Sequence, residues 1–286
     1  MNVAVLGVGD AGQEISRLCV RGGNEVSIHA EDPSAAMDAI DVIERHLERA
    51  DVRGESLDAT TGLTAAVSNV DLVVETTIDD ADRLGERFAE LEALVGRETL
   101  VATNQPSLSV TAAAGALDHP GRALGFRVHP DDTGVVEVVT ADQTAEETLD
   151  RAASFVEGLG ATPLFVADTP GPVSGRLAVA LEVEAIRLLE GGVAGVETID
   201  DLLVDGYDHA VGPLERADRV GLQRRLDLLE YLAEEVGERY EPPETLTERV
   251  ARGKTGRNAG EGFYAWEGGD PVRPAVEGPA FERSGR

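Results

Sequence analysis

The sequence contains a single cysteine, Cys19, so the chain cannot form an intramolecular disulfide. Cys19 lies on the apolar side of an expected helix, which favours a buried core thiol over a reactive one. No apolar run approaches the length that spans a membrane, and residues 1–20 lack a basic segment followed by an apolar one. We therefore expect a soluble, cytoplasmic protein with no membrane partner.

Positive charge is scarce in this sequence. Lysine and arginine number 25 against 54 acidic residues, the formal net charge is −29, and Lys254 is the only lysine. At molar salt the Debye length falls to about 3 Å, which screens the self-repulsion that such a charge creates. Because the acidic residues are spread along the whole chain, we interpret them as a halophilic adaptation to a salt-rich cytoplasm. The same charge argues against nucleic acid as a partner.

The chain begins with a short apolar run, Val3 to Leu6, which has the composition of a buried parallel strand. Glycines follow at positions 7, 9 and 12, and then a helical pattern. In a strand–turn–helix context, Gly7 permits the tight turn, Gly9 allows a pyrophosphate to approach, and Gly12 lets the helix pack closely on the strand. The positive end of the helix then faces the phosphates. This stretch predicts a dinucleotide-binding fold.

Strand-like and helix-like segments alternate over the first part of the chain. Predicted strands fall at residues 3–6, 25–29, near 57, 71–75, 99–103, 122–129, 135–140 and 162–166, and the longer predicted helices at 33–50, 80–95 and 144–159. Ser107 is expected to cap a short helix that ends at Gly115. The alternation predicts the α/β class, with a doubly wound Rossmann parallel sheet. Ligands then lie at the carboxyl ends of the strands, where Gly7, Glu75 and Asn104 fall.

The pattern changes at residues 168–172. Leucines then recur at helical spacing, as at Leu177 and Leu181, and no strand is predicted before Phe263. We therefore predict two domains, a Rossmann domain over residues 1–167 and a second, all-helical domain over 168–286. Residues 267–286 are rich in glycine and proline, and we expect them to form a frayed tail.

Several motifs occur together, in one order, between residues 3 and 266: Gly7-Val-Gly-Asp-Ala-Gly12, Asp71-Leu-Val-Val-Glu75, Ala102-Thr-Asn104 with Ser107-Leu108, Val136-Glu-Val138, Asp168-Thr-Pro-Gly171, Glu184-Ala-Ile-Arg-Leu-Leu189, Val211-Gly-Pro-Leu-Glu215 and Gly260-Glu-Gly-Phe-Tyr264. In this combination the chain resembles the L-3-hydroxyacyl-CoA dehydrogenases. The resemblance implies an NAD-binding domain and a helical domain that forms a homodimer. It also implies hydride transfer between the 3-hydroxyl carbon of an acyl-CoA and nicotinamide. In that chemistry a histidine takes the hydroxyl proton and a glutamate orients the histidine.

The chain departs from the family at the catalytic motif. Where the family has Gly-x-His-Phe-Phe-Asn-Pro, residues 125–130 read Gly-Phe-Arg-Val-His-Pro, so Arg127 stands in the place of the histidine. Alternation puts His129 on the same face of the strand, and a shift of two residues would bring it to the catalytic place. Glu137 matches the family's glutamate, so His129 and Glu137 are the candidate catalytic residues. Arg127 cannot act as a base, because guanidinium stays charged; it either bridges to Glu137 or binds a substrate carboxylate.

The resemblance assigns cofactor binding to Gly7, Gly9 and Gly12, and it places Glu75 and Asn104 at the nicotinamide end. Ser107 is the candidate substrate-binding serine, because Pro106 replaces the other serine of the family's loop.

The acid that binds the adenosine ribose is displaced. Its expected position is Ala30, and Glu31 and Asp32 follow. Glu31, one residue late, is our candidate for this role, and acids at this turn repel a 2′-phosphate, which favours NAD over NADP. The histidines show no metal-ligand spacing, so we expect no metal.

Three hypotheses follow. The first is an NAD-dependent dehydrogenase of 3-hydroxyacyl-CoA substrates. The second is a nucleotide-binding paralogue that has lost catalysis and has a binding or regulatory role. Arg127, Pro106 and Gly175, which stands where the family has an asparagine, suggest this. The third is a dehydrogenase of a small hydroxy acid whose carboxylate pairs with Arg127.

Overall fold

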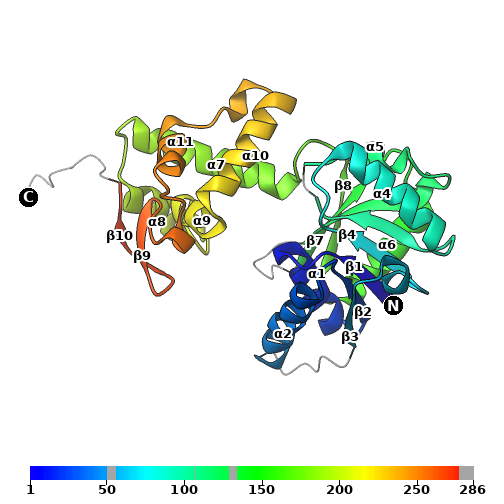
Figure 1. Ribbon diagram of the computed structural model, residues 1–286. Helices are drawn as coiled ribbons and strands as arrows, with labels where there is room; N and C mark the ends of the chain where they lie inside the picture. The colour runs from blue at the N-terminus through cyan, green and yellow to red at the C-terminus, as the bar shows by residue number, and fades with distance from the viewer. Residues whose placement is uncertain (50–55, 106, 129–133, 277–286) are drawn as a thin grey trace, which may run out of the picture. The chain divides into compact units, whose positions relative to one another are not determined.

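Eight strands form one sheet in the computed structural model, which describes residues 1–49, 56–105, 107–128 and 134–276. The spatial order is β3-β2-β1-β4-β5-β6-β7-β8. Figure 1 labels β1, β2, β3, β4, β7 and β8 of this sheet. The strands are β1 (Asn2–Leu6), β2 (Glu25–His29), β3 (Leu57–Thr60), β4 (Leu72–Glu75), β5 (Leu100–Thr103), β6 (Ala123–Val128), β7 (Val135–Thr140) and β8 (Thr162–Ala167). The chain crosses over between β3 and β4 to the other side of β1, and this reversal of strand order is typical of the doubly wound Rossmann fold predicted above.

The sheet differs from the predicted parallel arrangement at one end. Strands β1 to β6 are mutually parallel, but β7 pairs with β6 in the antiparallel sense, and β8 runs parallel to β7. Only residues 129–134 separate β6 from β7 in the sequence. A parallel crossover needs a dozen residues or more, so this short connection permits only an antiparallel neighbour.

Helices cover both faces of the sheet. One face packs against α1 (Asp10–Arg21), α2 (Pro33–Arg49) and α6 (Glu146–Gly158), and the other against α3 (Leu63–Ala66), α4 (Ala81–Leu94) and α5 (Val110–Ala114). Residues of β1 alternate between the two cores, with Val3 and Val5 on the first and Ala4 and Leu6 on the second. Cys19 is 1% exposed in the first core, and burial raises the pKa of its thiol to about 12. The prediction of a buried core cysteine is therefore confirmed.

The chain divides into two compact units, Met1–Pro172 and Val173–Arg286. Segment 168–172, assigned above to the second domain, thus belongs to the first unit. The second unit contains α7 (Val173–Glu190), α8 (Val196–Tyr207), α9 (Pro213–Val220), α10 (Leu222–Glu235) and α11 (Glu244–Ala251). The predicted helical stripe lies on α7, where the side chains of Leu177 and Leu181 are 68% and 36% exposed. The buried face of α7 carries Val179, Val183 and Ile186.

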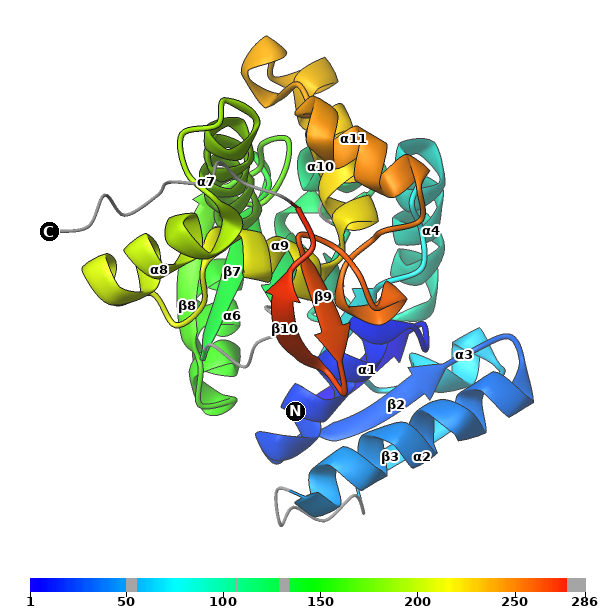
Figure 2. The ribbon, with the colours of Figure 1, turned by 90° about the vertical axis from the view of Figure 1, so that its left-hand side faces the viewer.

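The second unit is not all-helical. Strands β9 (Tyr264–Glu267) and β10 (Asp270–Pro274) form an antiparallel hairpin (Figure 2). The expectation of a frayed tail from residue 267 is therefore wrong as far as residue 274, and residues 277–286 lie outside the described residues. Gly268 and Gly269 form the turn with φ values of 63° and 96°, which glycine adopts at no steric cost.

A buried carboxylate attaches this hairpin to the helices. Asp218 on α9 is 1% exposed and accepts hydrogen bonds from the backbone N–H groups of Phe263 and Tyr264 and from Trp266 Nε1, at 2.8, 2.9 and 2.9 Å. Burial raises the pKa of Asp218, against the effect of these donors. Trp266 therefore packs in the core of the second unit, where it is 7% exposed. Among the described helices, none combines the length and the hydropathy that a membrane span requires.

Candidate active site

The glycine turn has the geometry that a phosphate-binding loop needs. Gly7 has φ 120°, and a Cβ on it would lie 2.4 Å from Thr76 Oγ1. A Cβ on Gly12 would lie 2.1 Å from the Gly7 carbonyl oxygen, so only glycine allows α1 to begin this close to β1. A Cβ on Gly9 would meet no described atom within 4 Å, which leaves open space beside the start of the helix. An anion in that space would face the backbone N–H groups of the first turn of α1.

The two acids after β2 have different surroundings. Asp32 Oδ1 accepts a hydrogen bond from Ser34 N at 2.9 Å, and the Asp32 carbonyl accepts from Ala36 N at 3.0 Å, so Asp32 caps the start of α2. Ala30 is buried, whereas Glu31 is exposed. Of the three positions considered for the ribose acid, Glu31 is the one with an exposed carboxylate that has no role in starting a helix.

Glu75, at the carboxyl end of β4, is fully buried. Its Oε1 accepts two hydrogen bonds of 2.6 Å, from Thr77 N and Thr77 Oγ1. Its Oε2 accepts no hydrogen bond from any described residue, and Arg87 Nη1 lies 3.9 Å away. A buried carboxylate oxygen without a donor is costly, and a ligand hydroxyl would satisfy it. This geometry fits a cofactor ribose at the edge where the glycine turn lies.

The loop after β5 is fixed to its neighbour. Asn104 N donates to the Glu75 carbonyl at 3.0 Å, and Gln105 Nε2 donates to the Thr76 carbonyl at 3.1 Å. Asn104 and Ser107 are both half-buried, and Pro106 lies outside the described residues. The structure therefore brings Asn104 beside Glu75, and Gln105 beside Thr76, which lies next to Gly7.

The predicted cap of the short helix is wrong. Ser109, not Ser107, caps α5, because Ser109 Oγ accepts from Ala112 N at 3.1 Å. Ser109 Oγ also donates to Asp168 Oδ2 at 2.7 Å, and Thr111 N donates to the same oxygen at 2.7 Å. The predicted end at Gly115 is confirmed. Ser107 thus has no capping role and remains a candidate for substrate binding.

Arg127 and Glu137 are directly opposite each other in the antiparallel β6–β7 pair, so their side chains share one face of the sheet. They are 7% and 3% exposed. The guanidinium extends back over Gly125, where a Cβ would lie 3.3 Å from Arg127 Nη1, and Nη1 donates to the Thr103 carbonyl at 2.8 Å. This arrangement favours a structural role for Arg127 over capture of a substrate carboxylate. His129, our candidate base, lies outside the described residues.

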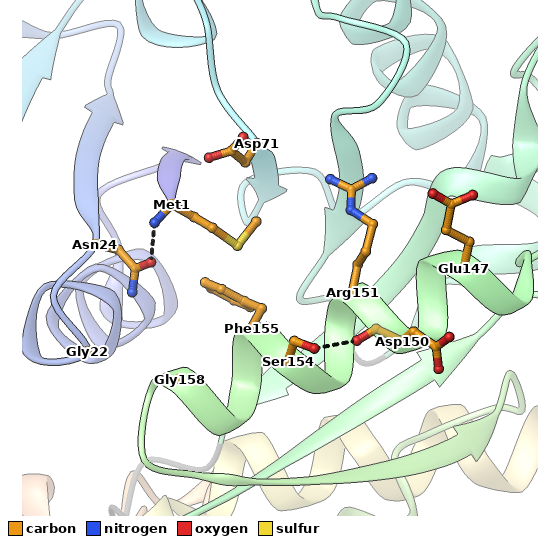
Figure 3. Close-up of a pocket in the computed structure, with 10 residues that line it drawn as sticks. All are labelled: Met1, Gly22, Asn24, Asp71, Glu147, Asp150, Arg151, Ser154, Phe155 and Gly158. Carbon is orange, nitrogen blue, oxygen red and sulfur yellow. Dashed lines mark hydrogen bonds between the residues drawn. The ribbon is translucent and has the colours of Figure 1, made fainter.

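A pocket of about 600 Å³ lies at the other edge of the sheet (Figure 3). Met1 and Asp71, which precede β1 and β4, line it together with Asn24 and the α6 residues Arg151 and Phe155. It therefore lies at the amino ends of the strands, away from the glycine turn. Its lining contains none of the candidate site residues. Within the described ranges, no group of three or more His, Cys, Asp or Glu side chains could hold a metal.

Two family models match the chain. Residues 2–169 match the 3-hydroxyacyl-CoA dehydrogenase NAD-binding domain, and residues 171–266 match the 3-hydroxyacyl-CoA dehydrogenase C-terminal domain. The chain belongs to the 3-hydroxyacyl-CoA dehydrogenase family.

Relatives support this membership. The chain is 32% identical over 278 residues to a probable 3-hydroxybutyryl-CoA dehydrogenase of Deinococcus radiodurans, covering 93% of this chain and all of that one. The FadB2 structure of M. tuberculosis is 31% identical with a TM-score of 0.86, covering 93% of this chain and 98% of that chain. The 3-hydroxybutyryl-CoA dehydrogenase structure from Escherichia coli K12 is 29% identical with a TM-score of 0.87, covering 96% of this chain and 61% of that chain.

Sequence reasoning missed three residues that shape the candidate site of this dehydrogenase-family chain. Thr76 fills the space beside Gly7, Thr77 binds Glu75, and Gln105 joins two loops. Their position one to two residues beyond the ends of β4 and β5 was the available signal. Which carbonyl or carboxylate each side chain contacts depends on which strand is its neighbour, and the sequence does not reveal the strand order.

Proposed function

We propose that the protein is an NAD-dependent dehydrogenase that transfers hydride between the 3-hydroxyl carbon of an acyl-CoA and nicotinamide. The observation that carries the proposal is the buried Glu75 Oε2, which accepts no hydrogen bond from the described residues and lies at the same sheet edge as the open glycine turn. The chain also matches both domains of this family. When bound, the oxidised form of NAD would accept the hydride and the reduced form would donate it in the reverse direction.

In this proposal the protein's own groups bind, orient and move a proton. The turn Gly7–Gly9–Gly12 holds the pyrophosphate, Glu75 accepts a hydrogen bond from a ribose hydroxyl, and Asn104 orients the nicotinamide end. Ser107 holds the substrate oxygen. When the carbon loses hydride, the hydroxyl loses its proton to a base, for which we propose His129 with Glu137 as its support. This assignment of His129 rests on strand alternation and on the family motif.

The test is NADH oxidation with acetoacetyl-CoA in molar KCl. We expect turnover by the wild type and a loss of about 100-fold or more in His129→Ala, the size expected for removal of a general base. His46→Ala is the matched control, because His46 is exposed on α2 and its Nδ1 contacts only the Val42 carbonyl within its own helix. NADH binding without turnover would instead indicate the nucleotide-binding paralogue. Turnover that persists in His129→Ala would assign the proton to another group.

The preference for NAD is tested at Glu31. A carboxylate here repels the 2′-phosphate of NADP, so the wild type should bind NADH more tightly than NADPH. Glu31→Gln should reduce this preference, whereas Glu44→Gln, a charge change further along α2, should not. Equal affinities of the wild type for the two cofactors would contradict the role of Glu31.

We also propose a homodimer formed through the second unit, in a salt-rich cytoplasm. The exposed α7 side chains Val173, Leu177 and Leu181 recur every four residues, at 42%, 68% and 36% exposure, and form an apolar stripe. Light scattering in molar KCl should give twice the chain mass, and Leu177→Glu should reduce it. A wild type that scatters as a monomer would contradict the proposal.

A further inference from the structure

Three side chains link neighbouring strands along the carboxyl edge of the sheet. Thr76 Oγ1 donates to the Leu6 carbonyl at 2.7 Å, Gln105 Nε2 to the Thr76 carbonyl at 3.1 Å, and Arg127 Nη1 to the Thr103 carbonyl at 2.8 Å. Because β1, β4, β5 and β6 are adjacent in that order, these bonds form a row across four strand ends. We call this row the edge brace.

Gln105 occupies the middle of the edge brace. Leu6 and Thr103 are the last residues of β1 and β5, so the outer two bonds end on strands, whereas the Gln105 bond joins one loop to another. The backbone of Gln105 is held as well, because its N–H donates to Thr103 Oγ1 at 3.1 Å. The preceding residue, Asn104, donates its N–H to the Glu75 carbonyl. The bond from Gln105 therefore fixes the Asn104 backbone relative to the loop that carries Thr76 and Thr77.

We infer that Gln105 is a positioning residue for hydride transfer, and that it acts through Asn104. The inference rests on the proposed function. Hydride transfer depends steeply on the separation and angle of the reacting carbons, and a displacement of about 1 Å can cost about 100-fold in rate. The glycine turn supplies pyrophosphate affinity independently of Gln105. Loss of the Gln105 bond should therefore lower kcat much more than it weakens NADH binding.

A second glutamine provides a matched control. Gln143 Nε2 donates to the Thr111 carbonyl at 3.2 Å, and Gln143 is half-buried, as Gln105 is. Gln143 follows β7, which ends at the opposite edge of the sheet because it is antiparallel to β6. A purely structural hydrogen bond would give the same result at both positions.

The experiment compares Gln105→Glu, Gln105→Lys and Gln143→Glu with the wild type. Glutamate keeps the length but lacks a donor at neutral pH, whereas lysine keeps a donor. We expect kcat to fall about tenfold or more in Q105E, with the Kd for NADH changed less than about threefold. Q105K should recover most of kcat, and Q143E should stay within about twofold of wild type. In a double-mutant cycle, adding Q105E to Asn104→Ala should cause little further loss, because Gln105 acts through Asn104.

Hydrogen exchange provides a measurement that does not need turnover. The Asn104 amide of the NADH complex should exchange about tenfold faster in Q105E than in wild type or Q143E. If the wild type binds NADH without turnover, the proposed function fails, and the exchange rate of the Asn104 amide still tests the role of Gln105 in the edge brace. Q105E with wild-type kcat and wild-type exchange would overturn the inference, as would equal effects of Q105E and Q143E. A wild type that does not bind NADH would overturn both proposals.

Discussion

Removal of Arg225 should destabilise the second unit by an amount that depends on pH. Glu182 on α7 and Arg225 on α10 are 3% and 8% exposed, and they meet at 2.8 Å both between Nη2 and Oε1 and between Nε and Oε2. Burial raises the pKa of Glu182 to about 7, although Arg225 and Arg216 act to lower it. In Arg225→Met a buried carboxylate loses its nearest cation, so the pKa of Glu182 should rise further.

The magnitude follows from distance and burial. Attraction over 2.8 Å amounts to about 6 kcal/mol at an effective dielectric constant of about 20, and the desolvation of both groups cancels part of it. Removing one partner of such a pair costs about 3–5 kcal/mol while the other stays charged. Between pH 4.5 and about 7 the folded state holds a proton on Glu182 that the unfolded state has released, so this contribution to stability falls as pH rises. Because Glu182 is protonated below its pKa with or without Arg225, the loss in Arg225→Met should be small near pH 5.5. It should grow as pH rises through about 7, and it should reach its full size only above the raised pKa of the variant.

The assay is urea unfolding at constant KCl, followed by the fluorescence of Trp266. This is the only tryptophan of the chain, and its bond to Asp218 places it in the core of the second unit. The double variant Glu182→Met with Arg225→Met removes both charges and should lie within about 1 kcal/mol of wild type. A single variant that loses the same free energy below and above the pKa of Glu182, or a double variant as unstable as the single one, would refute the reasoning.

Three shorter predictions concern the first unit and the surface. Burial acts to raise the pKa of Glu92, but hydrogen bonds from the Asp118 and His119 amides and from Arg122 outweigh it and lower the pKa. The ionised Glu92 therefore contributes stability that is lost as pH falls below about 4.5. In thermal unfolding, Glu92→Gln should lose less stability than the wild type over this pH range. Gly12→Ala should abolish NADH binding in a fluorescence titration or unfold the first unit, because the added Cβ would lie 2.1 Å from the Gly7 carbonyl oxygen. Gly158→Ala is the control and should do neither, because its Cβ would meet no described atom within 4 Å. The net charge of −29 predicts an unfolding midpoint that rises steeply from about 0.1 M to molar KCl, and a midpoint insensitive to salt would contradict a halophilic adaptation.

Much of the first unit could be predicted because its strands are continuous apolar runs with clear ends. Strand β2 has the predicted bounds, Glu25–His29, and β4 begins one residue after the predicted start. The missed features depend on partners remote in sequence or on turn chemistry. The cap of α5 is Ser109 rather than Ser107, and Ser109 also donates to Asp168, which lies 59 residues later. The hairpin β9–β10 has a Gly-Gly turn at Gly268 and Gly269. A Gly-Gly pair is a hairpin signal, but the glycine-rich composition of this segment led to the prediction of a frayed tail.

The candidate site could be predicted only in part, for the same reason. Glycine spacing identified the turn, and strand ends identified Glu75 and Asn104, because these depend on local sequence. The environment of Arg127 depends on register: pairing with Glu137 on one side and the Thr103 carbonyl on the other are properties of three strands. The same holds for Leu177 and Leu181, since a helical stripe predicts an apolar face but not what covers it.

The buried thiol on α1 connects cofactor binding to chemical reactivity. Cys19 lies on α1, whose first turn contains Gly12. The burial and the raised pKa of the Cys19 thiol protect it from alkylating reagents while α1 stays in place. Modification of Cys19 in the native protein therefore requires α1 to open. A ligand that binds only the closed form lowers the open population by the factor 1 + [L]/Kd. Saturation with dinucleotide should therefore slow the alkylation of Cys19, and the ratio of the two alkylation rates reports the affinity for the dinucleotide.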